Sequence, residues 1–216
     1  MSEEQALADA RARITDYRNR IQNLDDNTAD LLFREARNHN AWQDRDVSDD
    51  QLREIYDLLK FGSTSSNTQP ARLIFIRSAE AKECLRPCLM PTNVDKTMAA
   101  PVTALLAYDL DFYTNFGELY PVRPEMGERF ANDADVARHF SFQQITLQGA
   151  YLIMAARAMG LDCGPMSGFD NAKLDEAFFA GTTWRSNFLV NLGKGDPSKL
   201  FDRHPKFAFD EACQIA

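Results

Sequence analysis

The chain has 216 residues, of which 44% are hydrophobic and 26% charged, and its net charge is −8. This length suits one domain, or two small ones, with a sizeable core, and the composition is ordinary for a soluble globular protein. The acidic balance argues against nucleic-acid binding, and no apolar run approaches the ~20 residues of a transmembrane helix.

The N-terminal segment is charged and has no apolar signal-peptide core, so we expect a cytoplasmic protein. A heptad-like stripe predicts a helix there, formed by Leu7, Ala10, Ile14, Tyr17, Ile21 and Leu24. This helix either packs on its own domain or embraces a second subunit. We treat residues 1–27 as a helical extension and residues 28–216 as a single domain.

Two more helices are expected before the first strand. One covers residues 28–40, with Thr28 as its N-cap. The other follows Ser48, because SDDQ is a capping box and an apolar stripe runs through residues 52–59. Gly62 is expected to end it.

Residues 71–78 and 100–109 are predicted to be buried strands, with a short helix near residues 79–87 between them. Residues 110–132 contain Pro, Gly and aromatic residues with weak periodicity, which is typical of a functional lid. A long, central, buried helix over residues 134–159 follows and is closed by glycine.

The last third of the chain begins with a predicted tight loop, residues 164–170, whose Asp170 caps a short helix. A third strand is expected at residues 186–193, followed by a basic tail with a last short helix. Few strands, several helices and one long central helix predict an α+β layer fold. No G-x-G-x-x-G or P-loop spacing occurs, so neither a Rossmann domain nor a nucleotide triphosphatase is expected.

The cysteines and histidines offer little chemistry of their own. The four cysteines, Cys84, Cys88, Cys163 and Cys213, do not make a disulfide framework. For the Cys84/Cys88 pair we expect buried or half-buried free thiols in preference to a zinc site. The three histidines accompany neither a nucleophile elbow nor a zinc motif. No catalytic triad and no metal site are predicted.

Polar clusters in predicted loops remain as candidates. They are ARNHNAW (36–42), TSSNTQP (64–70), PTNVDK (91–96), GPMSGFD (164–170) and DRHPK (202–206). Each alone is explained by capping, turn formation or a solvated surface. Together they supply cations for a phosphate, amides for a ring edge and a backbone that a ligand can approach closely.

These clusters resemble the motifs of the nitroreductase-like flavoproteins. STSSNTQPA is similar to P-S-S-x-N-x-Q-P-W, NVDK to N-x-x-K, and GLDCGPMSGFD to the G-x-x-x-x-P-x-x-G-F-D loop. Within the family, ARNHNAW, VSDDQLREIY, LRP, KTMAAPVTALLA and GDPSKL resemble the RutE branch of predicted malonic semialdehyde reductases.

The resemblance implies a mixed β-sheet flanked by helices, in an intertwined homodimer whose terminal segments wrap the partner. It implies FMN at two subunit-interface sites, reduced by NADH or NADPH. Hydride would pass through flavin N5 to an acceptor in a ping-pong cycle.

The resemblance also assigns site residues. Lys96 would stabilise the charge of reduced flavin. The implied FMN-binding residues are Arg37, Asn38, His39, Thr64, Ser65, Asn67, Asn93, Lys96, Met166, Ser167, Gly168, Arg203 and Lys206. A guanidinium suits a phosphate, and an Asn amide suits the pyrimidine edge of the ring.

Some residues depart from the family pattern. His39 replaces a serine and Ala41 replaces a second cation, which leaves more charge stabilisation to Lys96. His39 either bonds the phosphate or ribityl chain or caps a helix. Ala71 stands where tryptophan is usual, and with Phe112 it is a candidate substrate residue.

Arg123 is a third candidate substrate residue. It either meets a substrate carboxylate or is a solvated arginine of the lid.

The expected function is reduction of a small aldehyde, such as malonic semialdehyde to 3-hydroxypropionate, by an FMN-dependent NAD(P)H oxidoreductase. One alternative is a general nitroaromatic or quinone reductase. A remote one is a non-catalytic flavin-binding or interaction protein.

Overall fold

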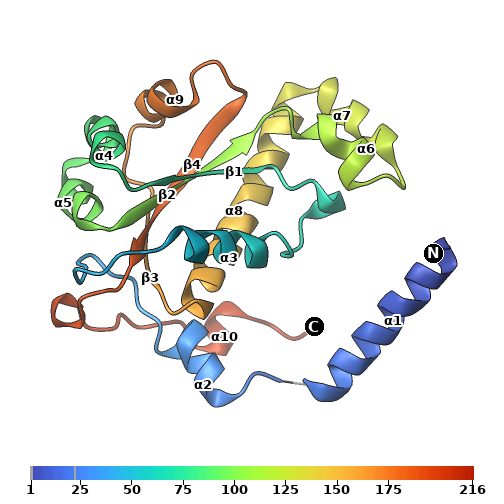
Figure 1. Cartoon of the computed structure of the whole chain (residues 1–216), viewed down its shortest axis with the longest axis horizontal. Helices are drawn as coiled ribbons and strands as arrows, with labels where there is room; N and C mark the ends of the chain where they lie inside the picture. The colour runs from blue at the N-terminus through green and yellow to red at the C-terminus, as the bar shows by residue number, and fades with distance from the viewer. Residues whose placement is uncertain (1, 22) are drawn as a thin grey trace. The chain divides into compact units, whose positions relative to one another are not determined.

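The structure, a computed structural model, describes residues 2–21 and 23–216 (Figure 1). Two units divide the chain, Met1–Ala36 and Arg37–Ala216. The first unit holds α1 (Glu3–Arg20), α2 (Asp26–Ala29) and a π-helical turn (Asp30–Arg34).

Helix α1 forms over the first part of the heptad-like stripe, but it ends at Arg20, so Ile21 and Leu24 lie beyond it. Ser2 caps it by accepting a hydrogen bond from the Gln5 amide at 3.2 Å. Its apolar stripe is about half exposed, with Leu7 at 50%, Ile14 at 54% and Tyr17 at 49%. An apolar face of this unit is therefore left without a covering layer among the described residues.

The predicted cap of the next helix is wrong. Asp25, not Thr28, is the N-cap, because its carboxylate accepts from the Thr28 amide at 2.8 Å and from the Thr28 hydroxyl at 3.0 Å. The helical part ends at Arg34 instead of residue 40. Asn38 is extended instead and forms a bridge with Cys163.

A sheet of four strands lies at the centre of the second unit, in the order β1-β2-β4-β3. The strands are β1 (Ala71–Ile76), β2 (Val102–Asp109), β3 (Asp162–Met166) and β4 (Trp184–Gly193). They pair antiparallel, and the one parallel pairing among the described residues is the Asn38–Cys163 bridge. The α+β class is confirmed.

Strand β3 corrects the predicted loop at residues 164–170. It pairs with β4 from Asp162 opposite Gly193 to Met166 opposite Leu189. A five-residue strand with Gly and Pro has no alternating pattern to reveal it. Only its hydrogen bonds to β4 make it a strand, and the loop itself is confined to the residues after Met166.

Helices cover both faces of the sheet (Figure 1). On one face lie α3 (Asp49–Leu59) and α8 (Ala134–Ala158), and on the other α4 (Ala79–Leu85), α5 (Pro91–Ala99) and α9 (Asn171–Phe179). Every residue of β2 is buried, as expected for a strand between two helical layers. Helix α5 was missed by the sequence analysis, which read residues 91–96 as a loop.

The predicted helix signals have mixed outcomes. The Ser48–Gln51 capping box of α3 is confirmed, and so is Gly160 at the end of α8, with φ +70°. Gly62 plays another part. A Cβ there would lie 2.0 Å from Cδ2 of Tyr151, so this glycine allows close approach to α8 instead of supplying a left-handed cap.

Residues 110–132 form a compact excursion with short helices: Phe112–Asn115, α6 (Phe116–Leu119), Pro124–Met126 and α7 (Gly127–Ala131). They enclose an aromatic cluster of Phe112, Phe116 and Phe130. Short turns around such a cluster explain the weak periodicity of this segment.

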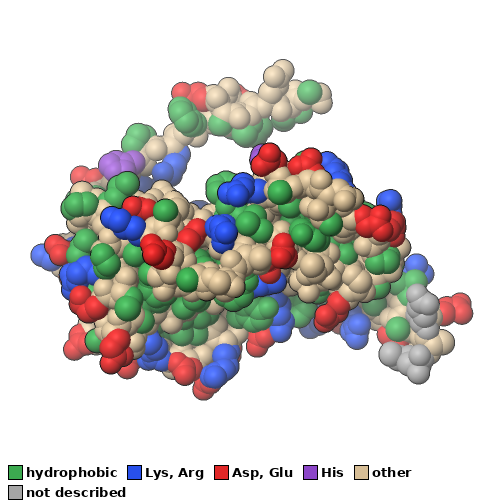
Figure 2. Space-filling view, turned by 90° about the horizontal axis from the view of Figure 1, so that it is seen from above, with side chains coloured by type: hydrophobic (Ala, Val, Ile, Leu, Met, Phe, Trp, Pro, Cys, Tyr) green, Lys and Arg blue, Asp and Glu red, His purple; other side chains and the backbone are tan. Residues whose placement is uncertain are grey.

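The rest of the chain adds no further layer. Residues 201–216 are exposed and end in α10 (Phe209–Ala212). Figure 2 shows acidic and basic side chains interspersed over the face that it displays. Cys84 and Cys213 are exposed free thiols, whereas Cys88 and Cys163 are buried ones. The predicted burial is therefore right for Cys88 and wrong for Cys84. Among the described helices, none is long and apolar enough to cross a bilayer.

Candidate functional site

The first group of predicted site residues lies along β3. The amide of His39 donates to the Cys163 carbonyl at 3.0 Å, so residues 37–40 run beside the strand. Gly164 makes this approach possible, because a Cβ there would lie 2.6 Å from the His39 carbonyl oxygen. The Arg37 guanidinium donates to the Phe201 carbonyl at 2.5 Å, which brings the start of the tail to the same place.

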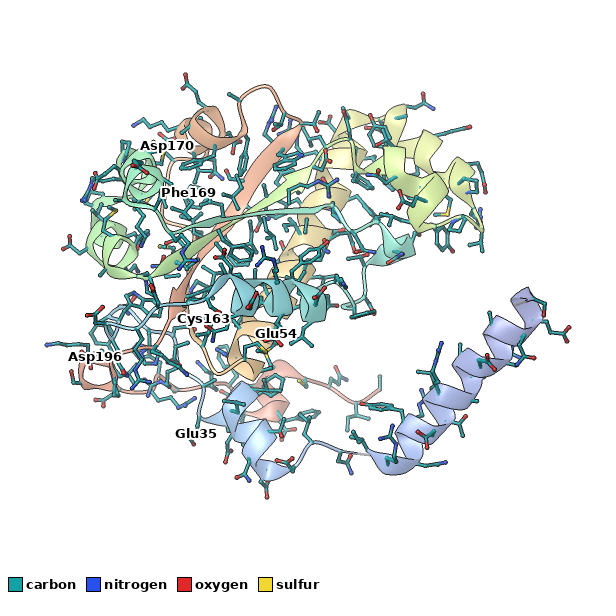
Figure 3. The ribbon with its side chains drawn as sticks, in the orientation of Figure 1. Glu35, Glu54, Cys163, Phe169, Asp170 and Asp196 are labelled. Carbon is teal, nitrogen blue, oxygen red and sulfur yellow. The ribbon has the colours of Figure 1, made fainter. Side chains whose placement is uncertain are left out.

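Helix α5 adds Asn93 and Lys96 to this group. Pro91 occupies its first turn, where a missing N–H costs nothing. Buried Asn93 donates to the Gly168 carbonyl at 2.8 Å, and the Trp42 indole donates to the Lys96 carbonyl at 2.9 Å. Figure 3 labels Phe169, the residue after Gly168, beside α4.

The Lys96 ammonium has no hydrogen-bond or ion-pair partner among the described residues. Its side chain is half-buried, and this burial lowers the pKa of Lys96. A partly desolvated cation without a counter-charge is costly. It is therefore poised for an anionic or electron-rich ligand.

Asn191 is a residue that sequence reasoning missed. It is fully buried in β4, accepts from the Thr103 hydroxyl at 2.7 Å and donates to the Thr97 hydroxyl at 3.3 Å. Its amide also lies 3.4 Å from the Lys96 carbonyl. Its position inside an apolar strand could have revealed it, because a buried side-chain amide needs hydrogen-bond partners.

His39 does not cap a helix, so that alternative is wrong. Its side chain is 8% exposed, with Nε2 3.6 Å from a carboxylate oxygen of Asp162. Nδ1 has no hydrogen-bond partner in the described part of the chain. A Cβ on Gly195 would lie 1.9 Å from this atom. The ring therefore supports the turn after β4.

The second group lies in the loop before β1. Ser66, Asn67 and Gln69 have φ of 52°, 51° and 41°, a left-handed conformation that costs about 1 kcal/mol per non-glycine residue. The backbone N–H of Gln69 donates to the Thr64 hydroxyl at 3.3 Å. The side-chain amide of Asn67 donates to the Leu119 carbonyl of α6 at 2.8 Å. The loop is thus joined to the excursion.

Helix α8 supports this loop with polar side chains at i, i+4 and i+7. Gln144 accepts from the Ser65 amide at 2.8 Å, and Gln148 accepts from the Ala71 amide at 3.0 Å. Tyr151 donates to the Ser63 carbonyl at 3.0 Å. Both glutamines are buried. Sequence reasoning missed them, although two Gln in an apolar helix were a usable signal.

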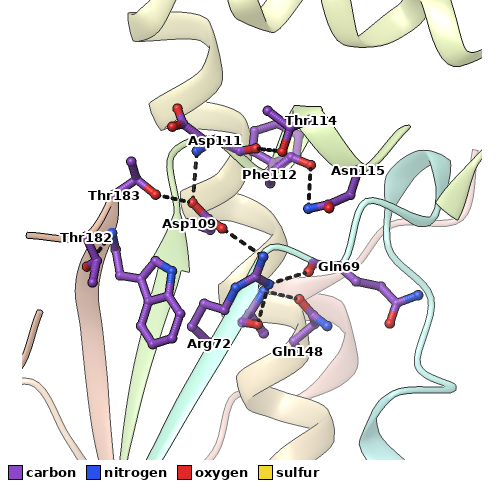
Figure 4. A network of polar contacts seen from close by, with 12 residues as sticks. Gln69, Arg72, Asp109, Asp111, Phe112, Thr114, Asn115, Gln148, Thr182 and Thr183 are labelled. Carbon is purple, nitrogen blue, oxygen red and sulfur yellow. Dashed lines mark hydrogen bonds and ion pairs between the residues drawn. The ribbon is translucent and has the colours of Figure 1, made fainter. Parts of the chain in front are cut away.

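An ion pair joins the start of β1 to the base of the excursion (Figure 4). Arg72 donates to Asp109 at 2.7 Å and to the Ala71 carbonyl at 3.0 Å. Asp109 also accepts from the Thr183 hydroxyl at 2.6 Å. Beside this pair, a cavity of about 220 Å³ is lined by residues that include Ala71, Gln69 and Glu118.

The other predicted substrate residues lie elsewhere. Phe112 is 1% exposed and stacks on Phe140 at 5.5 Å, so in this conformation it supports the excursion from inside. Arg123 is exposed and 3.3 Å from Glu125. Of the predicted FMN-binding residues, Arg203 and Lys206 lie on the exposed tail.

The two groups lie apart within one chain. Asn191, which contacts Lys96, pairs with Thr103, whereas Ala71 pairs with Tyr108. Five residue steps along β2 correspond to about 17 Å. The structure therefore joins His39 to β3 and joins Asn93, on the helix of Lys96, to the loop of Gly168, but it does not bring residues 64–67 to them.

Known proteins share the sequence and the fold. The model of the Nitroreductase family matches residues 36–194. The chain is 57% identical over 187 residues to HadB of Ralstonia pickettii, covering 86% of this chain and 95% of that protein. A Cupriavidus pinatubonensis protein is 54% identical over 189 residues, covering 87% and 96%. Both are provisionally named NADH dehydrogenase/NAD(P)H nitroreductase.

Two solved structures show the same fold. One, provisionally described as a nitroreductase in complex with FMN, comes from Exiguobacterium sibiricum. It has a TM-score of 0.75 at 17% identity and covers 90% of this chain and 98% of its own. The Bacillus subtilis protein ydfN has a TM-score of 0.76 at 15% identity, with 86% and 97% covered.

Proposed function

The chain belongs to the nitroreductase family and is an FMN-dependent NAD(P)H oxidoreductase, and we propose that its acceptor is a small aldehyde such as malonic semialdehyde. The RutE-like motifs of the sequence support this acceptor. FMN, held by these residues, would supply the redox chemistry, the transfer of a hydride from NADH or NADPH to the acceptor.

One observation carries the assignment of the flavin site: the half-buried ammonium of Lys96, unpartnered in the described chain, on the helix whose Asn93 holds the loop of Gly168. Such a cation stabilises negative charge that develops on a ring placed against it. A Cβ on Gly168 would lie 2.4 Å from the Asn93 amide, so the loop keeps its backbone free of a side chain. These residues fit a flat, polar-edged cofactor.

The proposed roles of the other residues follow from their chemistry. Arg37 and the basic tail residues Arg203 and Lys206 would bind the phosphate, since Arg37 already contacts the start of the tail. Asn93 would orient the pyrimidine edge of the ring.

We also propose that the chain acts as a homodimer in which each flavin site uses two subunits. The distance between Lys96 and the loop of Ser65 and Asn67 supports this, because one chain does not bring them together. A second copy would supply the loop, as two-fold symmetry permits. The exposed apolar face of α1 is available for the same contact.

Mixing two inactive variants tests the shared site. Lys96→Ala and Asn67→Ala should each lose most activity. Subunits exchanged between them should regain about a quarter of the wild-type rate, because half of the dimers then hold one intact site. Mixing Lys96→Ala with Asn93→Ala is the matched control and should regain nothing, because both residues belong to one group. No recovery in the first mixture would refute the shared site.

The acceptor is tested by steady-state kinetics. Malonic semialdehyde should give a kcat/KM at least about tenfold above a nitroaromatic or a quinone, a ratio worth about 1.4 kcal/mol of transition-state binding. The small cavity beside Ala71 supports a small substrate.

The reverse ranking would favour a general nitroaromatic or quinone reductase. The names of the relatives support that second candidate. Bound FMN that neither NADH nor NADPH bleaches without oxygen would instead indicate a non-catalytic flavin-binding protein.

A further inference from the structure

Lys82 is a buried lysine that the proposed chemistry does not use. It lies on α4 and is 6% exposed. Its ammonium donates to the carbonyls of Thr97, at 2.8 Å, and of Ala100. The Met98 carbonyl lies 3.4 Å away. No carboxylate pairs with Lys82 in the part of the chain that the structure describes.

These acceptors are the carbonyls at the C-terminal end of α5. The last carbonyls of a helix have no partner inside it and need donors from elsewhere. A cation there also complements the helix dipole. Lys82 meets both needs from a neighbouring helix, although burial opposes its charge and lowers the pKa of Lys82 to about 8.

The carbonyl of Lys96, the residue before Thr97, is bound by another element. The Trp42 indole N–H donates to it at 2.9 Å. Trp42 follows the segment of Arg37 that runs along β3. The backbone from Lys96 to Ala100 is therefore held by donors from α4 and from residue 42, with the Asn191 amide 3.4 Å from the Lys96 carbonyl.

We propose that Lys82 is a positioning residue of the flavin site, which fixes the end of α5 and so directs the Lys96 side chain, with Trp42 as the second support. This rests on the proposed function, in which Lys96 faces the flavin. A displaced α5 end would move the Lys96 ammonium away from the charge that it stabilises. Reduced FMN would then lose more binding energy than oxidised FMN.

The midpoint potential of bound FMN measures this difference directly. Lys82→Met should lower the potential by about 15 mV, equivalent to a threefold change in the ratio of the two affinities. Trp42→Phe removes the indole N–H together with part of the ring, and it should lower the potential in the same direction. Lys173→Met is the matched control, since Lys173 is exposed on α9, and it should leave the potential unchanged.

Amide hydrogen exchange of the flavin-free protein gives a second readout. Exchange in α5 should accelerate in Lys82→Met, but not in the control. Lower thermal stability with an unchanged potential would mean that Lys82 is only a structural cap, and would overturn the proposal. If Lys82→Met does not fold, Lys82→Gln and Trp42→Phe carry the same comparison.

Lys96→Ala distinguishes a failure of the positioning role of Lys82 from a failure of the proposed role of Lys96. If Lys96→Ala lowers the potential and neither Lys82→Met nor Trp42→Phe does, the positioning role fails alone. If Lys96→Ala itself leaves the potential unchanged, the proposed role of Lys96 fails.

Discussion

Lys96→Ala is expected to slow flavin reduction by NADH or NADPH by about 100-fold, the usual effect of removing one preorganised charge from a site. FMN affinity should fall much less, because the phosphate contacts proposed for Arg37 remain. Stopped-flow absorbance of the flavin under anaerobic conditions measures the rate, and titration of the flavin-free protein measures the affinity.

A matched variant strengthens this test. Asp95→Ala alters the exposed neighbour of Lys96 on the same helix and should leave the reduction rate near that of the wild type. Reduction kinetics that are unchanged in Lys96→Ala would remove Lys96 from the mechanism. A loss of FMN binding as large as the loss of rate would make it an anchor of the cofactor instead.

Gly164→Ala is expected to weaken both FMN binding and the fold. The new Cβ would lie 2.6 Å from the His39 carbonyl oxygen, a backbone atom that no side-chain rotation can move away. Residues 37–40 must therefore shift from β3. We expect the free energy of unfolding to fall by about 1–3 kcal/mol, the usual cost of overpacking, and FMN affinity to fall with it.

Denaturant unfolding and fluorescence titration with FMN measure these two effects. Gly117→Ala is the control, since nothing lies within 4 Å of its new Cβ. It lies in α6 and should leave FMN affinity unchanged, with stability equal or higher by up to about 1 kcal/mol, the helix propensity difference. Wild-type FMN binding by Gly164→Ala would mean that the position of residues 37–40 is unimportant for the cofactor.

Local sequence signals predicted much of the helical framework. The Ser48 capping box, the apolar period of α3 and the glycine after α8 act over a few residues, so the sequence shows them directly. Helix α5 was missed because Pro91 and two polar residues at its start are also typical of a loop. The cap of α2 was misplaced because Asp25 and Thr28 are both good caps, and only their hydrogen bond decides between them.

The sequence by itself determined the α+β class and the candidate residues, because periodicity, caps and motif order are properties of a linear chain. Only the tertiary structure decided that residues 162–166 are a strand, since its hydrogen-bond partners lie in β4. Tertiary structure also decided that Asn93, on the helix of Lys96, meets Gly168, whereas the loop of Ser65 and Asn67 lies toward the other end of β2. The register of a sheet sets such distances, and register depends on pairings between residues far apart in the chain.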